Sequence, residues 1–258
     1  MSQPPPLADN LPLNPSQNPA AVPSIPRLLY GTAWKQGRTT PLVLAALRSG
    51  FRGVDTAAQP LHYREDLVGA ALQQHLASPS AAGGPVPREP IFVQTKFSPN
   101  QATTGDDLDP PAHVPRAHRL GVSNVTLPQL EAICAAAVVP PAVVQNRFRA
   151  PFDAAVRAFC RERGIVYQAF WTLTANAALV GSDFVGGVAD AARVSREVVF
   201  YGLVMALGAC VLDGTTREEE MRADLEGVET LSRWADGHGR DLWEVAVRAF
   251  KKKVGDEV

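Results

Sequence analysis

Short apolar runs alternate with amphipathic segments along most of the chain after residue 26. The runs are brief and nearly free of polar residues, which is typical of parallel strands covered on both faces. The predicted strands are Leu28 to Gly31, Phe51 to Asp55, Ile91 to Thr95, His118 to Val122, Ala142 to Gln145, Ile165 to Phe170 and Ala209 to Leu212. Between them, apolar residues recur every three or four positions, as on one face of a helix. The pattern predicts repeated strand–helix units, either a doubly wound sheet or a (β/α) barrel.

Polar and aromatic residues at the ends of these strands favour the barrel, because the carboxyl ends of barrel strands meet at one rim where active sites are built. These strand-end residues are Asp55, Lys96, Ser123, Asn124, Gln145 and Phe170. A doubly wound dinucleotide-binding sheet would instead carry a glycine-rich turn after its first strand. The turn that begins at Gly31 lacks that fingerprint.

The first 26 residues are rich in proline and contain no lysine or arginine. They lack the basic and apolar regions of a secretory signal, so we expect a disordered leader over residues 1 to 26 and a cytoplasmic protein. Residues 27 to 258 are expected to form one domain. The longest apolar stretch, Val198 to Leu212, is shorter than the ~18 residues of a membrane span and is expected to be a buried helix leading into a strand.

The formal net charge of -1, with no basic cluster beyond Lys251 to Lys253, gives no reason to expect nucleic acid or a membrane as a partner. Cys134, Cys160 and Cys210 have neither paired spacing nor neighbouring histidines, so we expect reduced cysteines and no metal site. A small molecule is the expected partner. The sequence does not specify the oligomeric state.

Five motifs, taken in order, resemble the aldo-keto reductase family. They are Gly50 to Ala57, His62 to Glu65, Thr95-Lys96, Gly121 to Asn124 and Val144 to Asn146. The resemblance extends from about Arg27 to the C-terminus and is closest to fungal members, which often tailor secondary metabolites. It implies a (β/α)8 TIM-type barrel and NADP(H)-dependent reduction of an aldehyde or ketone to an alcohol.

The resemblance also implies catalytic roles for three residues. Tyr63 is the proton donor, Lys96 lowers the pKa of Tyr63, and Asp55 keeps Lys96 charged and reaches the cofactor ribose. These residue types suit the chemistry, because a phenol with an ordinary pKa near ~10 needs a neighbouring cation to exchange protons near neutrality.

A second set of residues is implied for the cofactor. Ser123, Asn124 and Gln145 hydrogen-bond the nicotinamide carboxamide, and Phe170 stacks on its ring. Thr215 and Thr216, at a predicted helix start, bind phosphate oxygens. The carboxylates of Glu218 to Glu220 follow directly, and because carboxylates repel a phosphate, NAD remains an alternative to NADP.

The segment between Lys96 and Ser123 is shorter than in the family by about a helix, a strand and a second helix. The histidine motif that orients the substrate carbonyl at the fourth strand is therefore absent, and the barrel is expected to be incomplete. Three interpretations remain open: a carbonyl reductase, an inactive or truncated gene product, and a nucleotide-binding scaffold without turnover. The residue types around Gly105 to Pro111 do not suit a crossover helix or an apolar strand.

Overall fold

A computed structural model of the chain describes residues 6–13, 24–79, 85–96, 119–150 and 152–256. The chain divides into two compact units. The first unit comprises Met1–Leu28, Arg119–Leu212 and Ala223–Val258, and the second comprises Leu29–His118 and Asp213–Arg222. The single domain expected over residues 27 to 258 stays a prediction.

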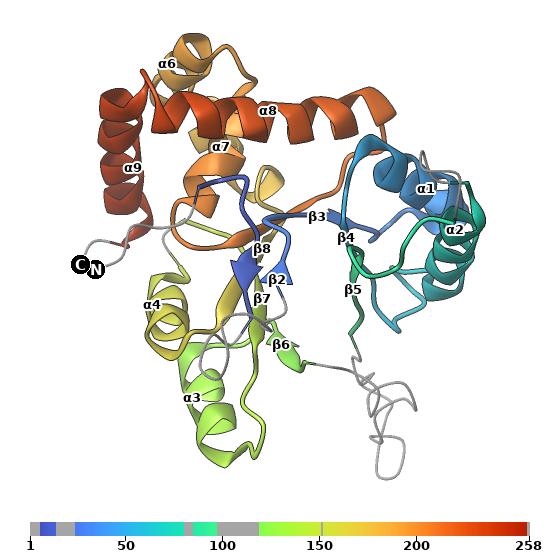
Figure 1. Cartoon of the computed structure of the whole chain (residues 1–258). Helices are drawn as coiled ribbons and strands as arrows, with labels where there is room; N and C mark the ends of the chain where they lie inside the picture. The colour runs from blue at the N-terminus through green and yellow to red at the C-terminus, as the bar shows by residue number, and fades with distance from the viewer. Residues whose placement is uncertain (1–5, 14–23, 80–84, 97–118, 151, 257–258) are drawn as a thin grey trace. The chain divides into compact units, whose positions relative to one another are not determined.

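The second unit is built on three parallel strands in the order β5-β4-β3. Its elements are β3 (Leu28–Gly31), a 3-10 turn (Gln36–Arg38), α1 (Thr39–Ser49), β4 (Gly53–Asp55), α2 (Glu65–Ala77) and β5 (Phe92–Gln94). Val43, Ala46 and Leu47 form the buried face of α1, and α1 packs against α2 (Figure 1). The helix ends at Gly50, whose φ of 117° is a conformation that glycine adopts without strain.

The first unit contains four parallel strands in the order β9-β8-β7-β6. They are β6 (Gly121–Ser123), β7 (Val143–Arg147), β8 (Val166–Phe170) and β9 (Cys210–Asp213). The crossovers are α3 (Leu127–Ala136) and α4 (Ala154–Arg163), followed by a 3-10 turn (Thr174–Asn176), α5 (Ala177–Val180), α6 (Asp183–Ala192) and α7 (Arg196–Met205). The chain ends in α8 (Glu218–Asp236), whose first turn is counted with the second unit, and α9 (Arg240–Val254).

Aromatic rings form the centre of the core of the first unit. Phe148, Phe200 and Phe250 pack together with ring centroids 5.5 to 6.4 Å apart. They join the loop after β7 to α7 and α9, and α9 also contacts α6 (Figure 1). Burial of such large rings is the main source of stability at this position.

Part of the proline-rich leader is ordered. β1 (Leu11–Pro12) and β2 (Ser24–Ile25) pair antiparallel, and Leu7, Leu13 and Ile25 are buried. The prediction of a disordered leader is therefore wrong for residues 6–13 and 24–26, because a few leucines and one isoleucine contribute enough apolar burial to order them. The remainder of the leader lies outside the described residues.

The fold is an incomplete (β/α)8 barrel of the TIM type. All seven predicted strands correspond to strands β3 to β9, several of them shortened at the N-terminal end, and α7 leads into β9 as the stretch from Val198 predicts. Among the described strands, β5 pairs with β4 alone and β6 pairs with β7 alone. The segment that is expected to lack the fourth strand falls on residues 97–118, outside the described residues.

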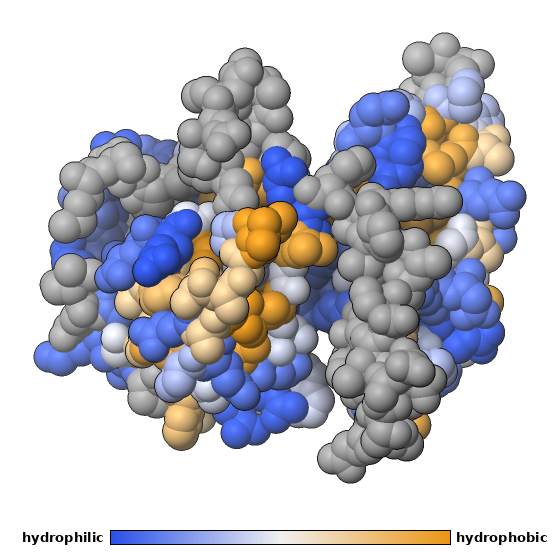
Figure 2. All heavy atoms as spheres, turned by 90° about the horizontal axis from the view of Figure 1, so that it is seen from below, coloured by the Kyte–Doolittle hydropathy of each residue, from blue (hydrophilic) through white to orange (hydrophobic). Residues whose placement is uncertain are grey.

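Apolar side chains are exposed where α3 leads toward β7. Val138 is 99% exposed and Val139 is 59% exposed. Figure 2 views the chain from the end at which α3 lies in Figure 1, and apolar residues gather at the surface there. In the described part of the chain, no helix combines the length and apolar character that a membrane span requires.

Candidate functional site

Asp55 is the centre of a polar cluster in the second unit. It ends β4, its side chain is 1% exposed, and its Oδ1 accepts hydrogen bonds from Lys96 Nζ and Gln94 Nε2, each at 2.5 Å. Its backbone carbonyl accepts from both the amide and the hydroxyl of Thr32, at 3.1 and 2.8 Å. The backbone of Asp55 is thus held from the side of β3, and its carboxylate from the side of β5.

Lys96 lies just beyond β5, on a backbone that continues the parallel ladder. The amide of Thr56 donates to the carbonyl of Gln94 at 2.9 Å, and the amide of Ala58 donates to the carbonyl of Lys96 at 2.8 Å. The side chain of Lys96 is 19% exposed. A salt bridge this far from solvent is screened less by water than a surface pair.

Tyr63 approaches the same lysine from the loop between β4 and α2. A turn at Gln59 orders this loop, because the carbonyl of Gln59 accepts from the amides of His62 and Tyr63 at 3.1 and 3.0 Å. Lys96 Nζ lies 5.2 Å from the centroid of the Tyr63 ring. The loop therefore brings Tyr63 to Lys96.

The pKa of Tyr63 is raised, first by burial of the phenol and then by the negative charge of Asp55. The lowering expected from Lys96 does not outweigh these two effects in this structure. The ammonium of Lys96 lies over the ring face of Tyr63 and is paired with Asp55 at 2.5 Å. Tyr63 is accordingly a protonated phenol across the neutral range.

The first unit contributes the other strand-end residues. Ser123 ends β6, and Asn124 follows it with a left-handed φ of 55°. The amide of Asn124 donates to the carbonyl of Gln145 at 3.0 Å, and its side chain lies 3.4 Å from Ser123 Oγ. An asparagine tolerates this conformation better than most residues do.

Gln145 and Phe170 lie on the neighbouring strands of the first unit. Gln145 is 6% exposed and donates from Nε2 to Oε1 of Gln168 at 2.9 Å, so the orientation of its amide is fixed. Phe170 ends β8 and is half-buried. The structure brings Ser123, Asn124 and Gln145 together on adjacent strands, but β7 continues for two residues past Gln145, where the sequence predicts its end.

Thr215 and Thr216 lie in the turn before α8. Thr215 is already engaged within the chain, because its amide donates to Asp213 Oδ1 at 2.9 Å and its hydroxyl to Glu220 Oε2 at 2.5 Å. Thr216 is exposed. A phosphate bound at this turn would therefore have to compete with Glu220 for the hydroxyl of Thr215.

Two polar residues of the second unit were missed by sequence reasoning. Gln94 and Lys96 are two residues apart on an extended chain, so their side chains share a face. This spacing could have identified Gln94 as a neighbour of the Asp55–Lys96 pair. Lys35 is buried, its Nζ donates to the carbonyl of Gly214, and burial lowers its pKa. No local pattern reveals that contact, because the two residues are 179 positions apart.

No family model matches the chain, and no curated protein matches it. Solved structures do match. An aldo-keto reductase enzyme from a Medee basin deep-sea metagenome library is 18% identical, with a TM-score of 0.65 over 86% of this chain and 94% of that one. A Bombyx mori aldo-keto reductase in complex with NADP is 18% identical, with a TM-score of 0.67 over 88% of this chain and 92% of that one. A third aldo-keto reductase, complexed with NADPH, is 17% identical, with a TM-score of 0.68 over 88% of both chains.

The chain has the aldo-keto reductase fold. In the second unit, Asp55, Lys96 and Tyr63 lie together. In the first unit, Ser123, Asn124 and Gln145 form a separate cluster of hydroxyl and amide groups. Within the described residues, no three His, Cys, Asp or Glu side chains gather as metal ligands would.

Proposed function

We propose that the chain is an NADP(H)-dependent oxidoreductase that reduces an aldehyde or ketone to an alcohol. The observation that carries the proposal is the arrangement of Lys96 2.5 Å from the carboxylate of Asp55 and 5.2 Å from the ring of Tyr63. The aldo-keto reductase fold supports it. Two of the solved structures with this fold were determined with NADP or NADPH.

In this proposal Tyr63 donates its phenolic proton to the carbonyl oxygen of the substrate. Its raised pKa keeps the proton on the phenol until the oxygen becomes basic. Lys96 supplies positive charge beside the phenolate that forms, and Asp55 keeps Lys96 in place through their buried salt bridge.

Four residues of the first unit suit the nicotinamide end of the cofactor. The hydroxyl of Ser123 and the amides of Asn124 and Gln145 can exchange hydrogen bonds with a carboxamide, and the ring of Phe170 offers a flat face for stacking. The fixed amide of Gln145 would orient the carboxamide. When bound, the cofactor supplies the hydride for the reduction.

The adenosine end of the cofactor is assigned to the turn of Thr215 and Thr216. Glu218, Glu219 and Glu220 lie in the first turn of α8, where their carboxylates oppose a phosphate and favour a ribose hydroxyl. We therefore include NAD(H) as an alternative to NADP(H). The roles in fungal secondary metabolism and the cytoplasmic location stay predictions.

The second candidate function is dinucleotide binding with little or no turnover. The raised pKa of Tyr63 favours it, because burial of the phenol and the charge of Asp55 hold the proton on Tyr63 more tightly than in an ordinary tyrosine. The shortened segment between Lys96 and Ser123, which lacks the family's carbonyl-orienting histidine motif, favours it as well.

The test is reduction of 4-nitrobenzaldehyde, followed by the loss of NADPH absorbance. Tyr63→Phe is expected to lower kcat/KM by ~100-fold or more while NADPH affinity is unchanged, since loss of a general acid costs about that much. Tyr167→Phe is the matched control, because Tyr167 is also buried but donates to Asp153 in the first unit. NADPH binding without turnover in the unaltered chain supports the second candidate, and absence of both refutes both functions.

A further inference from the structure

Arg147, the last residue of β7, has a guanidinium that lies against two aromatic rings. Its Cζ is 4.2 Å from the ring centroid of Trp171 and 5.9 Å from that of Phe170. Within the part of the chain that the structure describes, the side chain of Arg147 makes no salt bridge and no hydrogen bond. Stacking uses the flat face of a guanidinium and leaves its edge, with five N–H donors, directed elsewhere.

The backbone at Trp171 is held in a costly conformation. Trp171 has a left-handed φ of 55° and is 46% exposed, which is unusual for a bulky residue. Such a conformation costs about 1–3 kcal/mol and persists where the surroundings impose it. The consequence is that an indole ring is presented at the end of β8, in contact with Arg147.

Asn176 hydrogen-bonds to both of the loops that begin next to Arg147 and Trp171. It is 7% exposed, and its Nδ2 donates to the carbonyls of Phe148 and Thr172 at 2.9 and 2.8 Å. Those two residues directly follow Arg147 and Trp171 in the sequence. The backbone that carries the guanidinium and the indole is therefore fixed before any ligand binds, which is the arrangement that a binding site needs.

Arg147 also shares a face with the residues proposed to hold the nicotinamide. In the parallel register, Gln145 pairs with Gln168 and Arg147 pairs with Phe170. Residues two apart on a strand point to the same face, so Arg147 lies one step beyond Gln145 toward the carboxyl ends of the strands. A ligand group bound to the guanidinium edge would lie beside the Phe170 ring.

We propose that Arg147 is an oxyanion-binding residue of this site. A guanidinium edge matches a carboxylate or a phosphate through two parallel hydrogen bonds. The oxyanion has two possible sources, the carboxylate of a carbonyl substrate and a phosphate of the dinucleotide. These two sources are named on the basis of the proposed function. The binding of an oxyanion is inferred from the contact between Arg147 and Trp171 and from the hydrogen bonds of Asn176.

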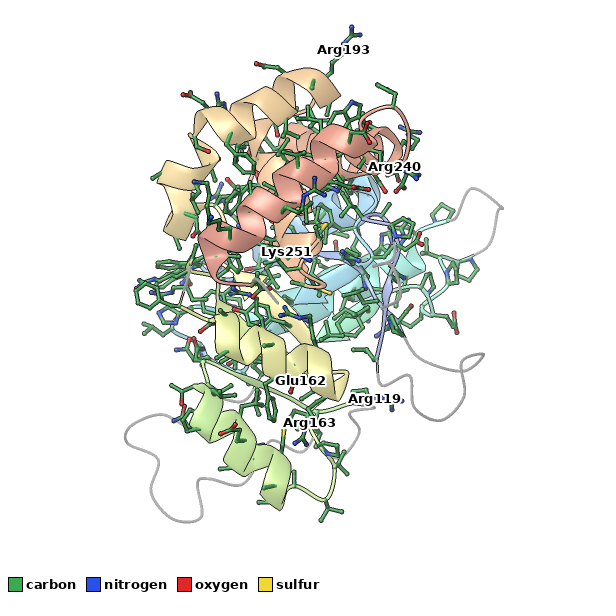
Figure 3. All side chains as sticks on the ribbon, turned by 90° about the vertical axis from the view of Figure 1, so that its left-hand side faces the viewer. Arg119, Glu162, Arg163, Arg193, Arg240 and Lys251 are labelled. Carbon is green, nitrogen blue, oxygen red and sulfur yellow. The ribbon has the colours of Figure 1, made fainter. Side chains whose placement is uncertain are left out.

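An arginine over an aromatic ring is by itself common, and α4 supplies an example for comparison. Arg163, in the last turn of α4 and labelled in Figure 3, lies 4.9 Å from the ring of Phe159 and is exposed. It lies on a helix instead of at a strand end, so it shares no face with Gln145. Arg163→Gln is therefore the matched control, with the same loss of charge and of an aromatic contact.

The experiment is calorimetric titration of the full-length chain and its variants with 4-carboxybenzaldehyde, with neutral 4-nitrobenzaldehyde and with NADPH. Arg147→Gln is expected to weaken binding of 4-carboxybenzaldehyde or of NADPH about tenfold or more. Arg147→Lys is expected to recover part of the affinity, because it keeps the charge and loses the two-pronged geometry. Arg163→Gln is expected to bind each ligand like the unaltered chain, and thermal melting verifies that every variant is folded.

The ligands for which Arg147→Gln loses affinity identify the source of the oxyanion. A loss confined to 4-carboxybenzaldehyde identifies a substrate carboxylate, and a loss for NADPH identifies a cofactor phosphate. The inference is overturned if Arg147→Gln binds both ligands normally, if Arg163→Gln loses as much affinity, or if the unaltered chain binds neither. Because the readout is binding, a chain that binds through Arg147 without reducing any aldehyde would refute the proposed reaction and leave the oxyanion site standing.

Discussion

Nζ of Lys96 lies 2.5 Å from Oδ1 of Asp55, on a carboxylate whose side chain is 1% exposed. Asp55 ends β4 and Lys96 follows the adjacent parallel strand β5, and Gln94, directly opposite Asp55 in the register, donates to the same oxygen. The cluster is therefore fixed by the backbone register as well as by its charges. Stability and catalysis are both expected to depend on it.

Asp55→Asn is expected to destabilise the chain by about 3–5 kcal/mol, because it leaves the largely buried ammonium of Lys96 without a counter-charge. Urea denaturation measures the change. Asp66→Asn removes the exposed partner of Arg64 and is the control, with no shift of the midpoint expected. Equal midpoints for the two variants would show that the Asp55–Lys96 pair does not stabilise the fold.

The stability of the chain is expected to fall in alkali because of its buried phenols. Burial raises the pKa of Tyr30, Tyr63 and Tyr167 above the ordinary value near 10. A group whose pKa is higher in the folded chain than in the unfolded chain stabilises the fold at pH values below its unfolded-state pKa. This stabilisation is lost as the pH rises from the unfolded-state pKa toward the folded-state pKa. The urea midpoint should therefore decline above about pH 10.

Tyr63→Phe is expected to make that alkaline decline shallower, since one buried phenol no longer titrates on unfolding. The measurement is the urea midpoint of the variant and of the unaltered chain at a series of pH values from neutral to alkaline. An unchanged slope would mean that Tyr63 ionises as readily in the folded chain as in the unfolded one.

Asp256 is expected to be essential for the stability of the first unit. Its carboxylate, 2% exposed, pairs with Arg157 at 3.0 Å and with Arg161 at 2.7 Å, and Arg157 is equally buried. Asp256→Asn should cost about 3–5 kcal/mol, because the buried guanidinium loses its counter-charge. Glu244→Gln breaks the exposed pair with Arg248 and is the control that should leave the melting temperature unchanged.

Two glycines are expected to respond to alanine in opposite directions. A Cβ at Gly202, in α7, would lie 2.5 Å from Cδ2 of Leu231, so Gly202→Ala should destabilise by about 1–3 kcal/mol through overpacking. A Cβ at Gly187, in α6, would meet nothing within 4 Å, so Gly187→Ala should stabilise by about 0.5–1 kcal/mol. Thermal or urea unfolding of both variants checks the signs, and a stabilising Gly202→Ala would contradict the packing of α7.

The sequence by itself determined the strands and the positions of most candidate residues. Apolar runs predicted all seven parallel strands, and the placement of Asp55 and Ser123 at strand ends and of Lys96 just beyond one followed from those runs. This was possible because burial on both faces leaves a local signature in the chain. The shared fold of solved aldo-keto reductases agrees with that architecture.

The tertiary structure decided what depends on residues distant in the sequence. The ordering of the leader strands, the contact of Lys35 with Gly214 and the pairing of Arg157 with Asp256 leave no local pattern. The direction of the pKa shift of Tyr63 also required coordinates, because it depends on burial of the phenol and on the nearby charge of Asp55. Periodicity reports which face of an element is buried, whereas charge and hydrogen bonding depend on distances that only the folded chain sets.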